Sequence, residues 1–133
     1  MSGHPYDDTC EPAAPRVPLR VAAPSSGAAI VLAALVDTGA DGTFIPERVA
    51  TQLGLPLVDH LTVEGVAGGR APARVYAATV ELGPLRTLCR LVAFEDEAIL
   101  GRDLLNRLVV LLDGPRLEAS LRKPSARKRR GGR

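Results

Sequence analysis

The chain has 133 residues, enough for one domain with a hydrophobic core and too few for a two-lobed enzyme with a cleft between its lobes. Apolar residues make up 46% of it and aromatic residues 3%, and glycine (13) and proline (11) are plentiful, which favours short strands and turns over a helical bundle. The formal net charge of +2 hides an asymmetry, because no acid follows Glu118 whereas seven Lys and Arg lie in residues 122–133.

These shifts in composition divide the chain into three parts. Residues 1–15 are polar and aperiodic, so we predict a flexible leader. Residues 16–121 carry the apolar runs of a folded domain. Residues 122–133 have too little apolar surface to order themselves, which predicts a disordered basic tail. The alternative for this tail is weak electrostatic contact with nucleic acid or another polyanion.

The first part of the domain reads as a hairpin followed by a short helix. Residues 17–23 and 29–36 are predicted strands around the turn PSSGA. The second strand is a continuous apolar run, which favours burial on both faces. Pro46 is suited to open a helix, and Gly54 is suited to end it.

The rest of the domain reads mostly as strands. Residues 61–83 form two extended arms around a glycine-rich tip, and the second arm alternates between apolar faces. A return strand over 85–94 follows, then about two helical turns over 102–108, and finally a hairpin over 109–121. This order predicts an all-β domain with one or two short helices, built as a small closed barrel or a sandwich.

One segment carries candidate chemistry. Asp37 follows the buried strand directly and begins Asp37-Thr38-Gly39-Ala40-Asp41. An ionised carboxylate is costly beside an apolar strand, whereas Thr and Gly supply a hydroxyl and a tight turn. The segment is either a strand-to-turn junction or an active-site loop.

A second motif decides between these readings. Residues Ile99-Leu100-Gly101-Arg102 place two apolar residues before a glycine that opens a short helix, and the glycine-rich hairpin lies between the two motifs. This order resembles the retropepsin family of single-domain aspartic proteases over about residues 17–121. The resemblance implies a retropepsin-like closed β-barrel with a flap hairpin, assembled as a two-fold homodimer.

The resemblance also explains how so short a chain could form a cleft enzyme. Each retropepsin chain supplies one catalytic acid, and two chains meet around one active site. Hydrolysis needs one carboxylate and one carboxylic acid near a single water, and two like charges so close share a proton. We therefore expect activity at mildly acidic pH. The family gives the role of second acid to the partner's copy of Asp37 and not to Asp41.

The resemblance assigns a role to each residue of the first motif. Asp37 of each chain would activate water and protonate the leaving amine. Thr38 would brace the pair across the two-fold axis, and the Gly39 carbonyl would receive the substrate backbone. Ala40 and Asp41 would lie beside the substrate.

The flap and the second motif are assigned in the same way. Gly65, Val66 and Ala67 match the flap tip over the substrate. Gly101 would allow close packing behind the catalytic loop. Arg102 would pair with Asp41 and tie the helix to that loop, or it is an ordinary solvated helix residue.

The sequence therefore predicts a homodimeric aspartic endopeptidase that acts on extended peptide or protein substrates. No metal and no cofactor are expected, and no apolar run is long enough to span a membrane, so we expect a cytoplasmic protein. The two cysteines have no metal or redox spacing and are expected to be free thiols. Two alternatives are a retropepsin-fold binding or regulatory domain with little proteolysis and a module tethered to nucleic acid by its basic tail.

Overall fold

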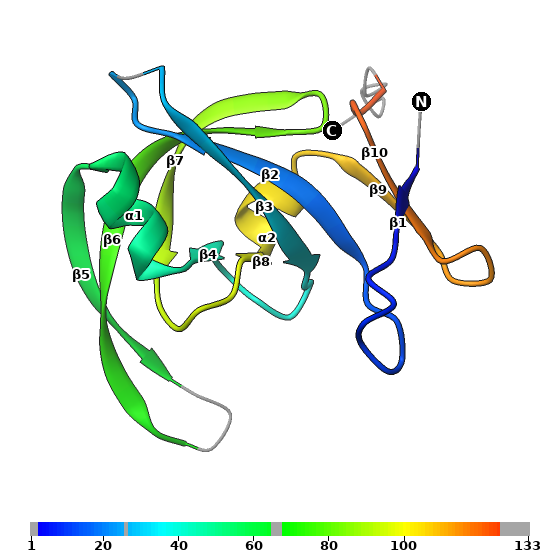
Figure 1. Ribbon diagram of the computed structural model, residues 1–133, viewed down its shortest axis with the longest axis horizontal. Helices are drawn as coiled ribbons and strands as arrows, with labels where there is room; N and C mark the ends of the chain where they lie inside the picture. The colour runs from blue at the N-terminus through cyan, green and yellow to red at the C-terminus, as the bar shows by residue number, and fades with distance from the viewer. Residues whose placement is uncertain (1–2, 26, 65–67, 126–133) are drawn as a thin grey trace, which may run out of the picture.

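The computed structural model describes residues 3–25, 27–64 and 68–125 of the chain. This part folds into a barrel with a smaller sheet beside it (Figure 1). In chain order the elements are β1 (His4–Pro5), β2 (Arg16–Ala22), β3 (Ala29–Val36), β4 (Phe44–Ile45), α1 (Glu47–Leu53), β5 (Leu57–Glu64), β6 (Arg70–Leu82), β7 (Leu85–Ala93), β8 (Ile99–Leu100), α2 (Arg102–Leu105), β9 (Val109–Asp113) and β10 (Glu118–Arg122).

Six strands close the barrel. Their hydrogen-bonded order is β2-β3-β8-β4-β7-β6, and β6 returns to β2 through the pairs Arg20–Glu81, Val21–Val80 and Ala22–Thr79. Strand β5 extends the sheet beyond β6, while β1, β10 and β9 form the smaller antiparallel sheet. The prediction of a mostly β domain built on a closed barrel is confirmed.

Local sequence signals account for the hairpins and for helix α1. Strands β2 and β3 pair antiparallel over their full lengths, and β6–β7 and β9–β10 are hairpins at the predicted places. Pro46 precedes α1 in an extended conformation, and Gly54 follows it with a φ of 61°, the left-handed conformation that ends many helices. Gly83 has a φ of 54° in the β6–β7 turn.

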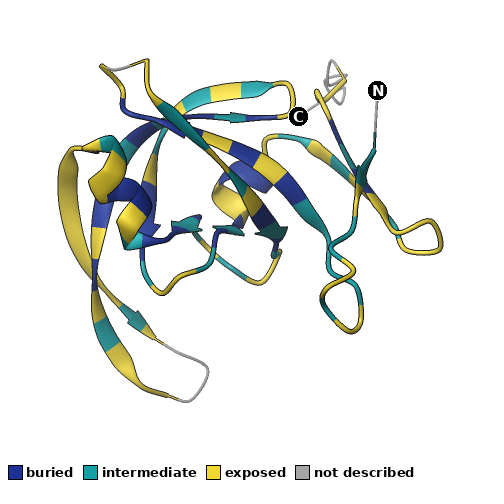
Figure 2. Ribbon diagram, viewed as in Figure 1, coloured by how far each residue is buried: buried dark blue, intermediate teal, exposed yellow. Residues whose placement is uncertain are grey.

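The core fills the barrel interior. Tyr76, Ala78, Val80 and Leu82 on β6 are buried, in agreement with the predicted alternation (Figure 2). Among the largest fully buried side chains in the rest of the barrel are Leu19, Ile45, Leu91, Leu100 and Leu104. The catalytic-loop candidate therefore leaves strand β3 at the edge of a packed core.

The leader differs from its prediction. We expected residues 1–15 to be flexible, but β1 pairs with β10, and the backbone N–H of Tyr6 donates to the Leu117 carbonyl at 2.8 Å. Arg16 then binds Asp7 (Nε to Oδ2, 3.2 Å). Polar composition did not indicate this order because β10 supplies the pairing partner from more than 100 residues away.

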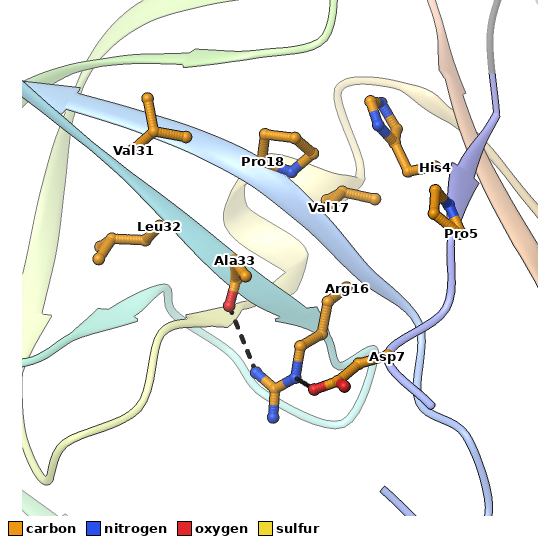
Figure 3. Close-up of a pocket in the computed structure, with 9 residues that line it drawn as sticks. All are labelled: His4, Pro5, Asp7, Arg16, Val17, Pro18, Val31, Leu32 and Ala33. Atoms are coloured by element: carbon orange, nitrogen blue, oxygen red, sulfur yellow. Dashed lines mark hydrogen bonds and ion pairs between the residues drawn. The ribbon is translucent and has the colours of Figure 1, made fainter. Parts of the chain in front are cut away.

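The outer face of β3 also differs from its prediction. Apolar content favoured burial on both faces, but Val31 is 62% exposed, and only Ala34 and Val36 of this strand are buried. The outer face borders a groove of about 560 Å³ between the β2–β3 hairpin and the leader (Figure 3). An apolar run alone does not specify how many neighbours will cover it.

Helix α2 is one turn long, shorter than predicted, and the chain passes through a turn into β9. In the predicted basic tail, Arg122 ends β10 and residues 126–133 lie outside the described part.

Cys10 and Cys89 form no disulfide, and burial is the main cause that raises the pKa of the Cys89 thiol to about 12. No helix in the described residues is long and apolar enough to cross a membrane.

Candidate active site

The loop that follows β3 turns sharply at Asp37. The Asp37 backbone N–H donates to the Leu100 carbonyl at 3.1 Å, which continues the parallel pairing of β3 with β8. The Asp37 side chain then accepts the Gly39 N–H at Oδ1 (2.9 Å). The turn is closed by the Ala40 N–H, which donates to the Asp37 carbonyl (3.2 Å). Asp37 is partly exposed. Its Oδ1 is held by the Gly39 N–H, and among the described residues its Oδ2 has no hydrogen-bond partner.

Helix α2 holds this loop from behind. The Arg102 N–H donates to the Ala40 carbonyl at 2.9 Å, and the Arg102 guanidinium donates to the Thr38 carbonyl at 2.7 Å through Nη1. Its other terminal nitrogen, Nη2, forms an ion pair with Asp41 Oδ1. The pairing of Arg102 with Asp41 is therefore present in the structure. The alternative, that Arg102 is an ordinary solvated helix residue, does not fit these contacts.

Gly101 lies directly against the same loop. A Cβ placed on Gly101 would stand 2.2 Å from the Gly42 carbonyl oxygen and 2.5 Å from its carbon, both backbone atoms. Real Cβ atoms do not approach so closely, so this position admits only glycine while the loop keeps its place. The close packing expected of Gly101 is therefore present.

Two further residues, Thr43 and Asp103, tie the motifs together, and neither was predicted from the sequence. Thr43 is fully buried and donates its hydroxyl to Asp103 Oδ1 at 2.8 Å. The same hydroxyl accepts the buried Gly101 N–H at 3.1 Å. The Thr43 backbone N–H also donates to Asp103 Oδ2 at 3.3 Å. The sequence offered two signals for this network. Thr43 carries a hydroxyl six positions after Asp37, and Asp103 carries a carboxylate directly after Arg102.

We expect Thr43→Val to destabilise the fold. Valine matches threonine in shape but leaves the buried Gly101 N–H without its acceptor, at a cost of about 2 kcal/mol in the free energy of unfolding. Urea unfolding followed by circular dichroism measures this loss. Thr62→Val on exposed strand β5 is the matched control, and equal unfolding midpoints for the two variants would remove Thr43 from the supporting network.

An apolar floor lies between the loop and the arms. Phe44 follows Thr43 directly and packs edge-to-face on Phe94, with ring centroids 6.4 Å apart. These rings and Val63 pack on a small cluster of buried residues separate from the barrel core, formed by Ala73, Val75 and Val92. This floor thus links the segment that follows the loop to the base of the arms through apolar contacts.

The predicted flap falls partly outside the described residues. Its arms are β5 and β6, but Gly65, Val66 and Ala67 at the tip lie in the part that is not described. Glu64 and Arg70 flank this tip and bind each other (2.9 Å) with both side chains mostly exposed. In Figure 1 the arms and the loop after β3 extend from the same side of the barrel.

The loop holds two carboxylates: Asp41 is paired with Arg102, and Asp37 lies next to the exposed residues Thr38 and Gly39. In the described residues no group of three or more His, Cys, Asp and Glu side chains could hold a metal ion. A single carboxylate can act as a base, but it cannot also supply the acid that peptide hydrolysis needs.

The sequence was compared with models of known protein families. Residues 27–107 match the gag-polyprotein putative aspartyl protease family, and this span includes both motifs and the arms between them. No curated protein matches the chain.

Solved structures share the fold at low sequence identity. A retropepsin-like aspartic protease from Rickettsia conorii matches with a TM-score of 0.55 and 17% identity, covering 94% of this chain and 98% of its own. The EIAV protease, solved with the inhibitor HBY-793, matches with a TM-score of 0.52 and 21% identity, over 70% of this chain and 86% of its own. A foamy viral protease-reverse transcriptase matches with a TM-score of 0.47 and 17% identity, and this chain spans only 14% of its length.

Proposed function

Because the chain belongs to the gag-polyprotein putative aspartyl protease family, we propose that it is a homodimeric aspartic endopeptidase whose two Asp37 carboxylates activate one water. The observation that carries the proposal is the loop itself. Asp37 is fixed at its base by the Gly39 N–H and the Leu100 carbonyl, and the loop is held from behind by Arg102. Such fixing keeps a carboxylate in one orientation before substrate arrives, which favours catalysis.

The proposed reaction needs both protomers. One Asp37 is ionised and takes a proton from the water, while the other is protonated and hydrogen-bonds the scissile carbonyl. As the water oxygen bonds to the carbonyl carbon, the second Asp37 gives its proton to the carbonyl oxygen and a diol forms. The first Asp37 then passes the proton from water to the amine nitrogen as the C–N bond breaks, and the second Asp37 takes back a proton from the diol. One shared proton on the pair is required at the start of each cycle, so both alkaline and strongly acidic solutions stop turnover.

We propose an extended polypeptide as the substrate. An extended backbone presents N–H and C=O groups on both edges, and the arms and the loop, which lie on the same side of the barrel (Figure 1), are expected to pair with them. The floor around Phe44 and Phe94 favours apolar side chains at one subsite. The direct test incubates the purified protein with a diverse peptide library at mildly acidic pH and identifies new termini by mass spectrometry. Intact peptides under all pH conditions would contradict the proposal.

We propose that the second copy docks on strand β9. Among the described strands β9 pairs only with β10, so its other edge has free backbone groups. Val109, Leu111 and Leu112 on this strand are 41%, 48% and 44% exposed. An apolar edge strand is poorly suited to water and well suited to an antiparallel copy of itself, which would bring two chains together around a two-fold axis.

We therefore expect Leu111→Glu to weaken the dimer. Two glutamates near the axis repel each other, and each loses an apolar contact, so the dissociation constant rises about 100-fold. Analytical ultracentrifugation over a dilution series measures the constant, and peptide cleavage is followed in the same samples. Specific activity falls with the dimer fraction, since each monomer holds one Asp37.

A matched variant tests this surface. Leu88 on β7 is 64% exposed, compared with 48% for Leu111, so Leu88→Glu introduces the same charge at an exposed apolar position outside β9. We expect wild-type association for it. If Leu88→Glu and Leu111→Glu associate alike, β9 is not the interface. If both are monomeric and fully active, the two-chain active site is wrong.

A further inference from the structure

The arms leave the barrel at one point on strand β6. Strands β6 and β7 pair from Leu82–Leu85 down to Arg74–Ala93, and beyond Arg74 the strand pairs only with β5. Residues 61–64 and 70–73 therefore form a two-stranded extension, which Figure 1 shows projecting from the barrel. A two-stranded ribbon has little packing of its own, so its angle to the barrel depends on contacts at the point of departure.

A single carboxylate, that of Glu47, binds β6 where the arms leave the barrel. Glu47, the first residue of α1, accepts at Oε1 both the Arg74 guanidinium (Nη1, 2.7 Å) and the Tyr76 hydroxyl (3.0 Å). Arg74 and Tyr76 flank the last stretch of β6 that still pairs with β7. The other carboxylate oxygen, Oε2, is buried with no hydrogen-bond partner among the described residues. Glu47 therefore holds the base of the arms through one oxygen.

The electrostatics agree with this geometry. The hydrogen bond to Glu47 is the main cause that raises the pKa of the Arg74 guanidinium. Burial, followed by the bond to Glu47, raises the pKa of the Tyr76 hydroxyl, which thus stays protonated as a donor. A charge-assisted pair and a buried phenol share one acceptor, so removing the carboxylate affects both.

Glu47 is also connected to the catalytic loop through the chain. The residues between them are the buried Thr43, whose hydroxyl accepts the Gly101 N–H, and strand β4, which pairs with β7 and β8. A cavity of about 360 Å³ opens at the same place and is lined by Glu47, Arg74, Ala93, Glu95 and others. The base of the arms therefore borders a cavity and is not closely packed. It is held by polar contacts to helix α1, which follows the loop in the chain.

We propose that Glu47 is a positioning residue that clamps the two arms at their departure from the barrel and so sets how firmly substrate is held. The effect on peptide binding rests on the proposed function, whereas the clamp on the arms does not. Glu47 touches neither Asp37 nor the loop around it, so its loss should weaken substrate binding and leave the chemical step nearly unchanged.

The clamp is tested without substrate by ¹⁵N relaxation dispersion on the full chain. In Glu47→Ala we expect exchange broadening in the amides of residues 61–64 and 70–73, with an open population about tenfold higher than in wild type. Barrel amides in β2 and β3 should stay unchanged. Glu47→Gln keeps the size and one acceptor oxygen, so it should fold even if Glu47→Ala does not. It should show a smaller rise than Glu47→Ala, because the retained oxygen still accepts hydrogen bonds and only the ion pair with Arg74 is lost.

Arg48→Ala is the matched control. Arg48 is the next residue on α1 and binds Asp96, which lies in the loop between β7 and β8 and not on β5 or β6, so its loss should leave the dispersion profile as in wild type. Arm dispersion equal to wild type in folded Glu47→Ala and Glu47→Gln would overturn the clamp, as would equal broadening in Arg48→Ala.

Kinetics provide the second measurement. For any peptide that the wild type cleaves, we expect KM of Glu47→Gln to rise about fivefold with kcat within twofold. A fall in kcat at unchanged KM would overturn the role in substrate holding. If the wild type cleaves no peptide, the proposed protease function fails, and the dispersion experiment still decides on the clamp.

Discussion

Asp37→Asn should abolish peptide hydrolysis, with a loss of about 10³-fold or more in kcat, because each active site then has no carboxyl group to accept or give a proton. Asparagine has the size of aspartate, and its carbonyl oxygen can still accept the Gly39 N–H that Oδ1 accepts in the wild type. The fold and the dimer should therefore persist. Initial rates on a fluorogenic peptide, with circular dichroism of the same samples, measure both expectations.

The control for this variant is Asp96→Asn. Asp96 lies on an exposed loop, where its side chain is 83% exposed and binds Arg48, so its loss should change the rate by less than twofold. If Asp37→Asn and Asp96→Asn cleave at the same rate, Asp37 is not the catalytic acid.

Mixing wild type with Asp37→Asn tests whether two chains share one site. In dimers that exchange subunits freely, the fraction that holds two intact Asp37 residues is the square of the wild-type fraction. Activity should follow this square as the variant is added at constant total protein. A straight line would mean that each chain is active by itself, and the two-carboxylate mechanism would be wrong.

Gly101→Ala should unfold or severely destabilise the protein. The added Cβ would lie 2.2 Å from the Gly42 carbonyl oxygen, and relief requires the catalytic loop to move away from α2. The same movement disturbs the Gly101 N–H bond to Thr43, so we expect a loss of about 3 kcal/mol or more in the free energy of unfolding. Thermal and urea unfolding measure the loss, and any folded fraction should show little peptide cleavage.

A second glycine provides the comparison. Gly114 lies in the β9–β10 turn, and a Cβ placed there meets nothing within 4 Å. Gly114→Ala should therefore be stable to within about 0.5 kcal/mol of wild type. A Gly101→Ala protein with the same unfolding midpoint as Gly114→Ala would show that the loop can shift at no cost, and the close packing would not constrain this position.

Several parts of the structure were predictable because their causes are local. Helix α1 begins after Pro46 and ends at Gly54, two residues whose backbone preferences act without neighbours. The alternation from Tyr76 to Leu82 indicated which face of β6 is buried, since the period of a strand is two. The run from Asp37 to Asp41 and the Gly101-Arg102 pair indicated the loop and its support because both are short motifs with a distinct chemistry.

Other parts were not predictable because they depend on partners far away in the chain. The polar composition of residues 1–15 predicted a flexible leader, yet strand β1 in this segment pairs with β10. The apolar run of β3 predicted two covered faces, but the barrel covers one and leaves Val31 exposed. The bonds of Thr43 to Asp103 span 60 residues, and no period or turn signal points from one to the other.

The sequence by itself therefore determined the strand content, the catalytic acid candidate and the family, since hydrophobic period, turn chemistry and short motifs are properties of neighbouring residues. Only the tertiary structure decided how the barrel closes through β2 and β6, which carbonyls Arg102 holds, why Gly101 must lack a side chain and where Glu47 binds the arms. These contacts join residues 27 to 64 positions apart, and their geometry exists only after the barrel has closed.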